Sequence, residues 1–600
     1  MKISGVFLSL LYLSLLVFDA HSQTTVRERP AEWNNLVFGG RFMDLFMPMP
    51  DIGKLTNDTW GDDNVKPRDI KNGIENKKYS FWGGNKVLGD DGKYHFFVCG
   101  WLESSPRGHA TWPNSIVFHA ISDNLYGPFV VKDTIGKGHN PEVYRLRDGR
   151  YVLYVIDGYY LSDGVNGPWT YNKFEFLNRD RRIIDGLSNL TFAQREDGSY
   201  LMVNRGGGIW FSQTGLSPYN QVTDERVYPP VTGEFEDPVV WRDNVQYHLI
   251  VNDWLGRTAF YLRSKDGVKW VVDPGEAYLP GISKHEDGTF ENWFKYERLK
   301  VFQDVYGRAI QANFAVIDVE KKYDQSRDNH SSKNISIPLT IPRLLTILDK
   351  NQINANTKII RVKIASEPGF NPLADINLNS LRFGGSAEVN FGRGCKVANT
   401  ERSGSDLIVS FDSHGNGITD DEFVAKMIGK TSDGKLLFGY ARLPWVKYIE
   451  PILSARLPDF VPNSKGFNIK VEVQNFGLIA SKAARLKIVY VKDEKEVEVG
   501  TGKIPKLNPY QKKIIEITCG SIFDKGVEYN IIVILNPDDK TSSKFHAKIT
   551  PAKLSFQEWA PTPLMGNLSY STMLMKSTSL RKQYPILYIC QTNYTLVYLS

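Results

Sequence analysis

The sequence contains few cysteines and no strong excess of charge of either sign. Only four of its 600 residues are cysteine, namely Cys99, Cys395, Cys519 and Cys590. So few thiols exclude a disulfide scaffold, and their spacing matches no metal site. The formal net charge of +6 is small, and no basic run or zinc pattern indicates nucleic-acid binding. We therefore expect buried single thiols and no nucleic-acid partner.

Long apolar runs are also absent beyond the N-terminus. The run VFLSLLYLSLLVF follows the basic start Met1-Lys2 and precedes the small residues AHSQ. Its 13 residues are short for a membrane span, since a spanning helix needs about 20. The pattern predicts a signal peptide over residues 1–22 and export to the periplasm or the extracellular space, with an uncleaved anchor as the alternative. No membrane span is expected elsewhere.

Helical periodicity is nearly absent, and residues 81–318 alternate between apolar and polar. One recurring pattern is a strand, a serine and a polar turn, as in VFHAISDNLYGPF and FYLRSKDGVKW. Its serines, Ser122, Ser162, Ser212 and Ser264, lie 40, 50 and 52 residues apart. Between these copies lies a second pattern, a hairpin such as DPVVWRDNVQYHLIVND.

A period of about 40–50 residues with several strands in each repeat is typical of a β-propeller. The hairpin occurs five times, the last copy beginning ERLKVFQD. We therefore predict an all-β chain with a five-bladed propeller over residues 33–320, in which the first strand of each blade lines a central channel. Glu236 and Asp237 open the first strand of the fourth blade, in GEFEDP, so they are predicted to face this channel.

Three stretches of this region resemble glycoside hydrolase family 43, whose members are five-bladed propeller glycosidases. SDNLYGPF resembles an outer turn of that family, NPEVYRLRDGRYVLYV its second-blade pattern, and EFEDP the segment that carries its general acid. The resemblance covers residues 33–318 and implies that Glu236 is the general acid. Glycosidic cleavage requires a carboxylic acid that protonates the leaving oxygen and a second carboxylate that activates water. A neighbouring charge such as Asp237 helps an acid to keep its proton.

Two carboxylates of the family pattern are missing from this sequence. Gly84 or Asn85 occupies the place of the family's base, and Asn189 that of its second aspartate. Elimination is one alternative, in which a dehydratase or lyase acts on an acidic sugar with His139 as acid or base. Another alternative is a propeller that binds carbohydrate without cleaving it. A third is that a different carboxylate replaces the base, and the candidates are Asp51, Asp62, Asp63 and Asp185.

Other residues are predicted to form the walls of the pocket. Arg298 opens the fifth blade and is predicted to hold a sugar carboxylate or sulfate, or else to pair with Glu236 or Asp237. The polar residues predicted to contact substrate are Asn85, Asn140, Glu142 and Asn189. The tryptophans that either stack on sugar faces or pack in the core are Trp82, Trp101, Trp112 and Trp254.

The second half is predicted to form two β-sandwich modules, over residues 334–452 and 453–552. The segment DSHGNGITDDEF in the first module is read as a turn, because a calcium loop would have glutamate where Phe423 stands. The second module resembles CARDB-type immunoglobulin-like modules in FNIKVEVQNFGLIASKAARLKIVYV. WAPTPLMGNLSYSTM resembles the start of a family 27 α-galactosidase domain, so residues 553–600 are read as a truncated or frameshifted tail.

Together these observations predict an exported glycoside hydrolase that acts, from a chain end, on plant or algal oligosaccharides. No cofactor is expected, although the family 43 resemblance allows calcium in the channel. A second carboxylate about 5–10 Å from Glu236 would favour hydrolysis. A pocket with His139 and tyrosines instead would favour elimination, and neutralisation of Glu236 by Arg298 would favour binding alone.

Overall fold

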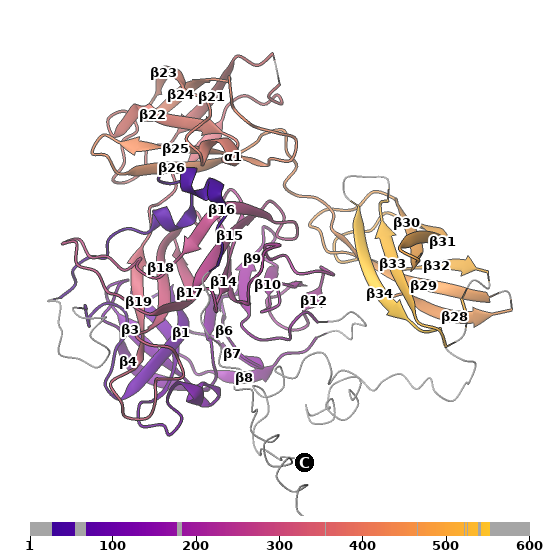
Figure 1. Cartoon of the computed structure of the whole chain (residues 1–600), viewed down its shortest axis with the longest axis horizontal. Helices are drawn as coiled ribbons and strands as arrows, with labels where there is room; N and C mark the ends of the chain where they lie inside the picture. Colours follow the sequence, from indigo (N-terminus) through magenta and orange to yellow (C-terminus); the bar gives the residue numbers. More distant parts are fainter. Residues whose placement is uncertain are drawn as a thin grey trace, which may run out of the picture.

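The computed structural model describes residues 27–53, 68–176, 183–354, 356–464, 466–520, 523–524, 526–537 and 542–551. The expected signal peptide, Asp62, Asp63, Cys590 and the expected tail lie outside these residues. Among the described residues, regular structure is almost all β, as the sequence predicts (Figure 1). No helix in this part of the chain is long and apolar enough to cross a bilayer.

Helical structure is limited to short turns in the described part of the chain. The elements are η1 (Ala31–Asn35), η2 (Phe42–Leu45), η4 (Gly108–Asn114) and α1 (Ser386–Val389). Cys99, Cys395 and Cys519 are buried thiols, which confirms the expectation for these three.

Residues 79–338 form five antiparallel sheets, each built from consecutive strands. The first contains β1 (Tyr79–Leu88), β2 (Tyr94–Leu102), β3 (Ile116–Ser122) and β4 (Val130–Lys137). The second contains β5 (Glu142–Arg145), β6 (Tyr151–Val155), β7 (Gly158–Ser162) and β8 (Thr170–Lys173). The third contains β9 (Thr191–Gln194), β10 (Tyr200–Val203), β11 (Ile209–Ser212) and β12 (Asn220–Gln221). The fourth contains β13 (Phe235–Arg242), β14 (Tyr247–Asp253), β15 (Thr258–Ser264) and β16 (Val271–Tyr278).

The fifth sheet moves a boundary that the sequence analysis placed too early. It contains β17 (Lys295–Gln303), β18 (Ala309–Ile317) and β19 (Ser332–Pro338). Because β19 pairs along its whole length with β18, residues 332–338 belong to this sheet. The region expected to end at residue 320 therefore extends to 338.

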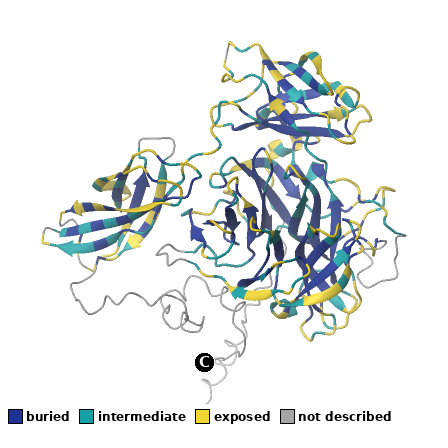
Figure 2. Ribbon diagram, turned by 180° about the vertical axis from the view of Figure 1, so that it is seen from behind, coloured by how far each residue is buried: buried dark blue, intermediate teal, exposed yellow. Residues whose placement is uncertain are grey.

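The first strands of the five sheets are neighbours. β1, β5, β9, β13 and β17 lie next to one another in chain order, and β17 returns to lie beside β1. Each sheet therefore has a neighbouring sheet on both of its faces. The strands β14 and β15 are buried at every position, and Figure 2 shows buried residues concentrated in the strands of the sheets.

One residue in the left-handed conformation stands at the same place in each of the five first-strand segments. These residues are Gly83, Asn140, Asn189, Asp237 and Arg298, with φ between 50° and 55°. In β1, β13 and β17 the strand register shifts at this residue, as in a β-bulge. Glycine, asparagine and aspartate tolerate the left-handed region, whereas arginine is seldom found there, so surrounding contacts must hold Arg298 in place.

The residue two positions further on joins one sheet to the next. The Oδ1 atom of Asn85 accepts a hydrogen bond from the N–H of Val143 at 2.6 Å, and its Nδ2 donates to the carbonyl of Val143 at 3.0 Å. In the third sheet, the Oγ1 atom of Thr191 accepts from the N–H of Val240 at 3.2 Å. These side chains satisfy buried backbone groups at the junction between sheets, which would be costly to leave unpaired.

Glu142 occupies this position in the second sheet. Its Oε1 atom accepts a hydrogen bond from the N–H of Phe192 at 3.2 Å, and its Oε2 atom forms an ion pair with Lys300 of β17. Burial lowers the pKa of Lys300 to about 7, while contact with Glu142 favours the charged amine. Glu142 therefore connects β5, β9 and β17 within the protein interior.

The remaining strands form two pairs of sheets, each pair enclosing one apolar core. The first pair contains β20 (Leu345–Ile347), β21 (Ile359–Ile364), β23 (Val397–Ser403) and β24 (Asp406–Asp412), facing β22 (Ile376–Gly384), β25 (Val424–Thr431) and β26 (Leu436–Arg442). One sheet of the second pair contains β27 (Leu453–Ala455), β28 (Asp459–Asn463), β29 (Gly466–Asn475) and β32 (Lys512–Cys519). The other contains β30 (Ala484–Lys492), β31 (Lys495–Ile504), β33 (Tyr529–Leu535) and β34 (Ser543–Ile549).

Replacing Thr191 with valine tests the junction between the third and fourth sheets. Thr191→Val keeps the side-chain shape but leaves the N–H of the buried Val240 without its acceptor. We expect the free energy of unfolding, measured by urea denaturation, to fall by about 1–3 kcal/mol. Thr191→Ser retains the hydroxyl and should lose less. Equal losses in the two variants would show that the hydrogen bond does not stabilise the junction.

Candidate active site

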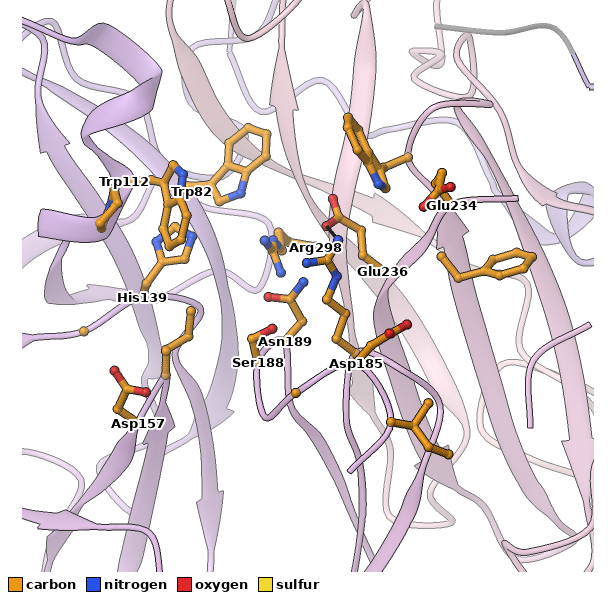
Figure 3. Close-up of a pocket in the computed structure, with 18 of the residues that line it drawn as sticks. Trp82, Trp112, His139, Asp157, Asp185, Ser188, Asn189, Glu234, Glu236 and Arg298 are labelled. Atoms are coloured by element: carbon orange, nitrogen blue, oxygen red, sulfur yellow. Dashed lines mark ion pairs between the residues drawn. The ribbon is translucent and has the colours of Figure 1, made fainter. Parts of the chain in front are cut away.

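A cavity of about 1590 Å³ lies where the openings of the five first strands meet. All five sheets contribute to its wall, through Trp82, His139, Asn189, Glu236 and Arg298 (Figure 3). The position of Glu236 answers a question raised by the sequence, because this carboxyl group does face a pocket. In Figure 3 it points toward the same open centre as Arg298.

Equivalent positions in the five sheets supply the residues at the inner end of the pocket. Each is the residue directly before the left-handed one, and the five are Trp82, His139, Ser188, Glu236 and Glu297. The first four line the cavity. Glu297 is fully buried beside it. At this position the first sheet has tryptophan, whereas the fourth and fifth have glutamate. The start of the first sheet therefore offers no carboxylate that could act as the base.

Three carboxylates gather at this point. Oxygen atoms of Glu236, Asp237 and Glu297 lie within 4.8 Å of one another. The side chain of Glu236 is 12% exposed, and its Oε2 atom lies 3.6 Å from Nη2 of Arg205. Asp237 and Glu297 are more deeply buried than Glu236. Glu236 is therefore the member of the group that a ligand in the pocket can reach.

Cations neutralise the two buried carboxylates. Lys295 Nζ lies 2.9 Å from Oε1 of Glu297, and Lys321 contacts the other oxygen. Burial alone would raise the pKa of Glu297, but Lys295, Lys321 and Arg298 hold it well below its usual range. Glu297 is consequently ionised at neutral pH.

Opposing effects act on the pKa of Asp237. Arg298 forms an ion pair with it, yet burial raises the pKa of Asp237 to about 7, and the charges of Glu236 and Glu297 act in the same direction as burial. The sequence left open whether Arg298 binds a substrate anion or pairs with a carboxylate. The Arg298 guanidinium pairs with Asp237, so Arg298 does not neutralise Glu236 by direct contact.

His139 faces the pocket from the second sheet. Burial and the charge of Arg298 lower the pKa of its imidazole well below the usual value, so the ring is neutral at pH 7. Its Nδ1 atom lies 2.9 Å from Oγ of Ser115. Trp112 stands against the ring, with centroids 4.8 Å apart. A neutral imidazole at this place is able to accept a proton.

The aromatic walls are partly as predicted. Trp82, Trp112 and Trp254 line the cavity, and Lys295 Nζ lies 4.9 Å from the centroid of the Trp254 ring. Trp101 is buried and packs against His109 and His139 behind the wall. Trp112 and Trp254 are half-buried and present flat apolar surfaces of the kind on which sugar rings stack. Trp82 is 1% exposed, and Lys321 Nζ lies 4.9 Å from the centroid of its ring.

The predicted substrate contacts divide into two groups. Asn189 lines the cavity, and its Oδ1 atom accepts a hydrogen bond from Nδ2 of Asn140 at 3.0 Å. Asn85 and Glu142 are placed elsewhere, because their polar atoms are used at the junctions between sheets. Asn140 supports Asn189 from a position outside the lining.

The described candidates for a replacement base lie in different places. Asp185 lines the cavity, and its Oδ2 atom lies 2.8 Å from Nη2 of Arg226. Asp51 instead forms an ion pair with the buried His285 at 3.2 Å and is not part of the lining. Of the described candidates, Asp185 is therefore the one that reaches the pocket.

Glu297 is the main site residue that the sequence analysis missed. It is the first residue of the fifth hairpin copy, ERLKVFQD, and corresponds to Glu236 in the fourth. Aligning the five hairpin copies in the sequence and comparing the residues at their starts would have identified it. Lys295, Lys321 and Arg205 carry no comparable signal, since only the folded chain brings them to the carboxylates.

Calcium fits the carboxylate group poorly. Glu236, Asp237 and Glu297 are the one cluster of this type found in the described parts of the chain. Calcium takes six to eight oxygen ligands, and two of these three carboxylates already contact lysine or arginine. A cation here would have to displace those side chains.

Solved structures similar to this chain include glycoside hydrolases of family 43. An α-L-arabinofuranosidase from Lactobacillus brevis is 12% identical, with a TM-score of 0.31, over 44% of this chain and 92% of that one. A family 43 protein from Bacillus licheniformis is 9% identical, with a TM-score of 0.29, over 81% and 91%. No family model and no curated protein matches the sequence. At these identities and scores, the chemistry has to be derived from the site itself.

The raised pKa of Asp237 predicts how stability depends on pH. The folded protein holds a proton that the unfolded chain, with a pKa near 3.9, releases, so this stabilisation is complete below about pH 4 and is lost as the pH rises through about 7. Asp237→Asn should remove this dependence. Between pH 5 and 7 we expect the unfolding free energy of the native protein to fall relative to the variant, by at most about 1.4 kcal/mol per pH unit.

Urea denaturation at several pH values measures this difference. Asp148→Asn serves as the control, because Asp148 forms an exposed ion pair with Arg150 and its pKa is lowered. The control should follow the native protein between pH 5 and 7. Parallel curves for Asp237→Asn and the native protein would contradict the assignment.

Proposed function

We propose that residues 33–338 form a five-bladed β-propeller whose pocket hydrolyses a glycosidic bond. Two β-sandwich modules follow, over residues 339–452 and 453–552, and the protein is exported. The substrate is a plant or algal oligosaccharide cleaved from a chain end. The observation that carries the proposal is the placement of Glu236, which faces a tryptophan-lined pocket and is paired at 3.6 Å with the partly exposed Arg205, while the buried Asp237 and Glu297 are paired with buried or half-buried cations.

In this proposal Glu236 is the general acid. Its carboxyl group donates a proton to the glycosidic oxygen as the bond to the anomeric carbon breaks. Asp185 is the candidate base: its carboxylate removes a proton from a water molecule that attacks the anomeric carbon. Arg226 forms an ion pair with Asp185, and Asp185 is accessible to water because its side chain is 31% exposed. Trp112 and Trp254 hold the sugar rings.

Elimination is the second candidate, and His139 is the observation that favours it. A neutral imidazole in the wall can remove a proton from a sugar carbon, with Glu236 protonating the departing oxygen. The product would contain a double bond and no added water. Hydrolysis and elimination therefore differ in the mass of their products.

Substitution of Glu236 tests its role as the acid. The purified protein is incubated with a panel of plant and algal oligosaccharides, and the products are measured by mass spectrometry. Hydrolysis adds one water across the two products. Glu236→Gln should lower kcat by about 10²–10⁴-fold, the usual contribution of a general acid.

Glu175→Gln is the matched control, because Glu175 is exposed on the second sheet's edge and lies outside the pocket lining. It should retain full activity. An unsaturated product would establish elimination instead, and no conversion of any oligosaccharide would leave a carbohydrate-binding propeller. Native activity in Glu236→Gln would refute the role of Glu236, whichever reaction is observed.

A further inference from the structure

The C-terminal module is joined to the third sheet through buried contacts. Phe476, which follows β29, is fully buried in the same apolar cluster as Leu201, Phe211 and Leu249 of the third and fourth sheets. The aromatic rings of Phe476 and Phe211 lie 6.4 Å apart. An apolar core shared in this way indicates a fixed docking position rather than a tethered module.

A buried arginine adds polar contacts at the same junction. Arg195 of the third sheet donates a hydrogen bond to the carbonyl of Phe476 at 3.1 Å and another to the hydroxyl of Tyr510 at 3.2 Å. Its guanidinium lies 3.9 Å from the centroid of the Phe211 ring. Ser454 also donates to the carbonyl of Val222 at 3.1 Å.

This docking brings β34 to the mouth of the pocket. The backbone N–H of His546 donates to Oδ2 of Asp224 at 2.8 Å, and its Nδ1 atom lies 3.0 Å from the same oxygen. His546 lines the same cavity as Glu236, although 310 residues separate them in sequence (546 minus 236). Figure 1 shows β34 on the side of its module that faces the five sheets.

A short segment connects this contact to the candidate base. Asp224, Glu225 and Arg226 are consecutive and all line the cavity. Arg226 forms the ion pair with Asp185, while Asp224 holds His546. The outer part of the pocket is therefore built from the third sheet and from the C-terminal module together.

The cavity is larger than one sugar unit needs. Sites for small molecules commonly measure about 300–1,000 Å³, and this one is about 1590 Å³. Its inner end contains the tryptophans and Glu236. Its outer end contains polar side chains that can exchange hydrogen bonds with sugar hydroxyls.

Charged groups of both signs line this pocket. The carboxylates Asp185, Asp224, Glu225 and Glu234 lie in the same wall as the guanidinium groups of Arg205 and Arg226. Together they offer acceptors and donors of hydrogen bonds to sugar hydroxyls.

We propose that the C-terminal module is a wall of the pocket, and that His546 with Asp224 forms an outer subsite for a sugar unit beyond the bond that is cleaved. The inference rests on the proposed glycosidase function for the nature of the ligand. The docking of the module is independent of that function.

Cross-linking tests the docking without any substrate. Asp224→Cys and His546→Cys are combined in the full chain and treated with a short bis-maleimide, and the linked peptides are identified by mass spectrometry. We expect an intramolecular link between the two positions. The control pairs Asp224→Cys with Glu516→Cys, since Glu516 is exposed on β32 in the other sheet of the module, and should give none. Failure to link, or equal linking in the control, would overturn the proposed wall.

Chain-length dependence tests the subsite. For the oligosaccharide series that the native protein cleaves, His546→Ala should raise KM about three- to tenfold for trisaccharides and longer chains, with little change in kcat, because one or two hydrogen bonds are lost. The disaccharide should be unaffected, and so should all lengths in His414→Ala, an exposed histidine of the other module.

The outcomes separate the two proposals. Cleavage that is insensitive to His546→Ala at every length would overturn the subsite, and so would an equal loss at every length. If the cross-link forms and no oligosaccharide is cleaved, the proposed hydrolase function fails while the wall stands. If oligosaccharides are cleaved without any cross-link, the function stands and the wall is overturned.

Discussion

The arrangement of the site depends on a junction that is repeated at the start of the first three sheets. A left-handed residue ends the channel-facing turn, and two positions later a polar side chain accepts a backbone N–H from the next sheet, as Asn85, Glu142 and Thr191 do. The left-handed residue places the side chain before it at the pocket. The hydrogen bond two positions later holds neighbouring sheets at a constant spacing. A buried N–H without its acceptor would be costly, so the register between sheets is strongly specified.

Charge balance decides which carboxylate is available for chemistry. Glu297 is buried and ionised because Lys295, Lys321 and Arg298 surround it, and Asp237 is paired with Arg298. Removing a charge from water is expensive unless a partner compensates for it. Such pairs therefore serve as rigid support, and Glu236, which opens to the pocket, is the group left to act on a ligand.

The two modules outside the five sheets attach to them at different places. The C-terminal module reaches the pocket mouth through His546, anchored by Phe476 and Arg195. The preceding module attaches elsewhere, where Lys426 donates to the carbonyl of Gly39 and Arg442 to that of Val245. One module thus borders the site, while the other fastens the N-terminal segment to the sheets.

The sequence by itself determined the local elements. Alternation of apolar residues and turns such as RDG and EDG define hairpins, and GEFEDP places Glu236 at the start of a strand, because these features depend on neighbours within a few residues. Only the tertiary structure decided which side chains meet. Asn85 and Glu142 became junction residues rather than substrate contacts, Glu297 came beside Glu236, and His546 reached the pocket. The physical reason is that such contacts join residues far apart in sequence, and closure of the sheets around a common channel, rather than any local pattern, determines their distances.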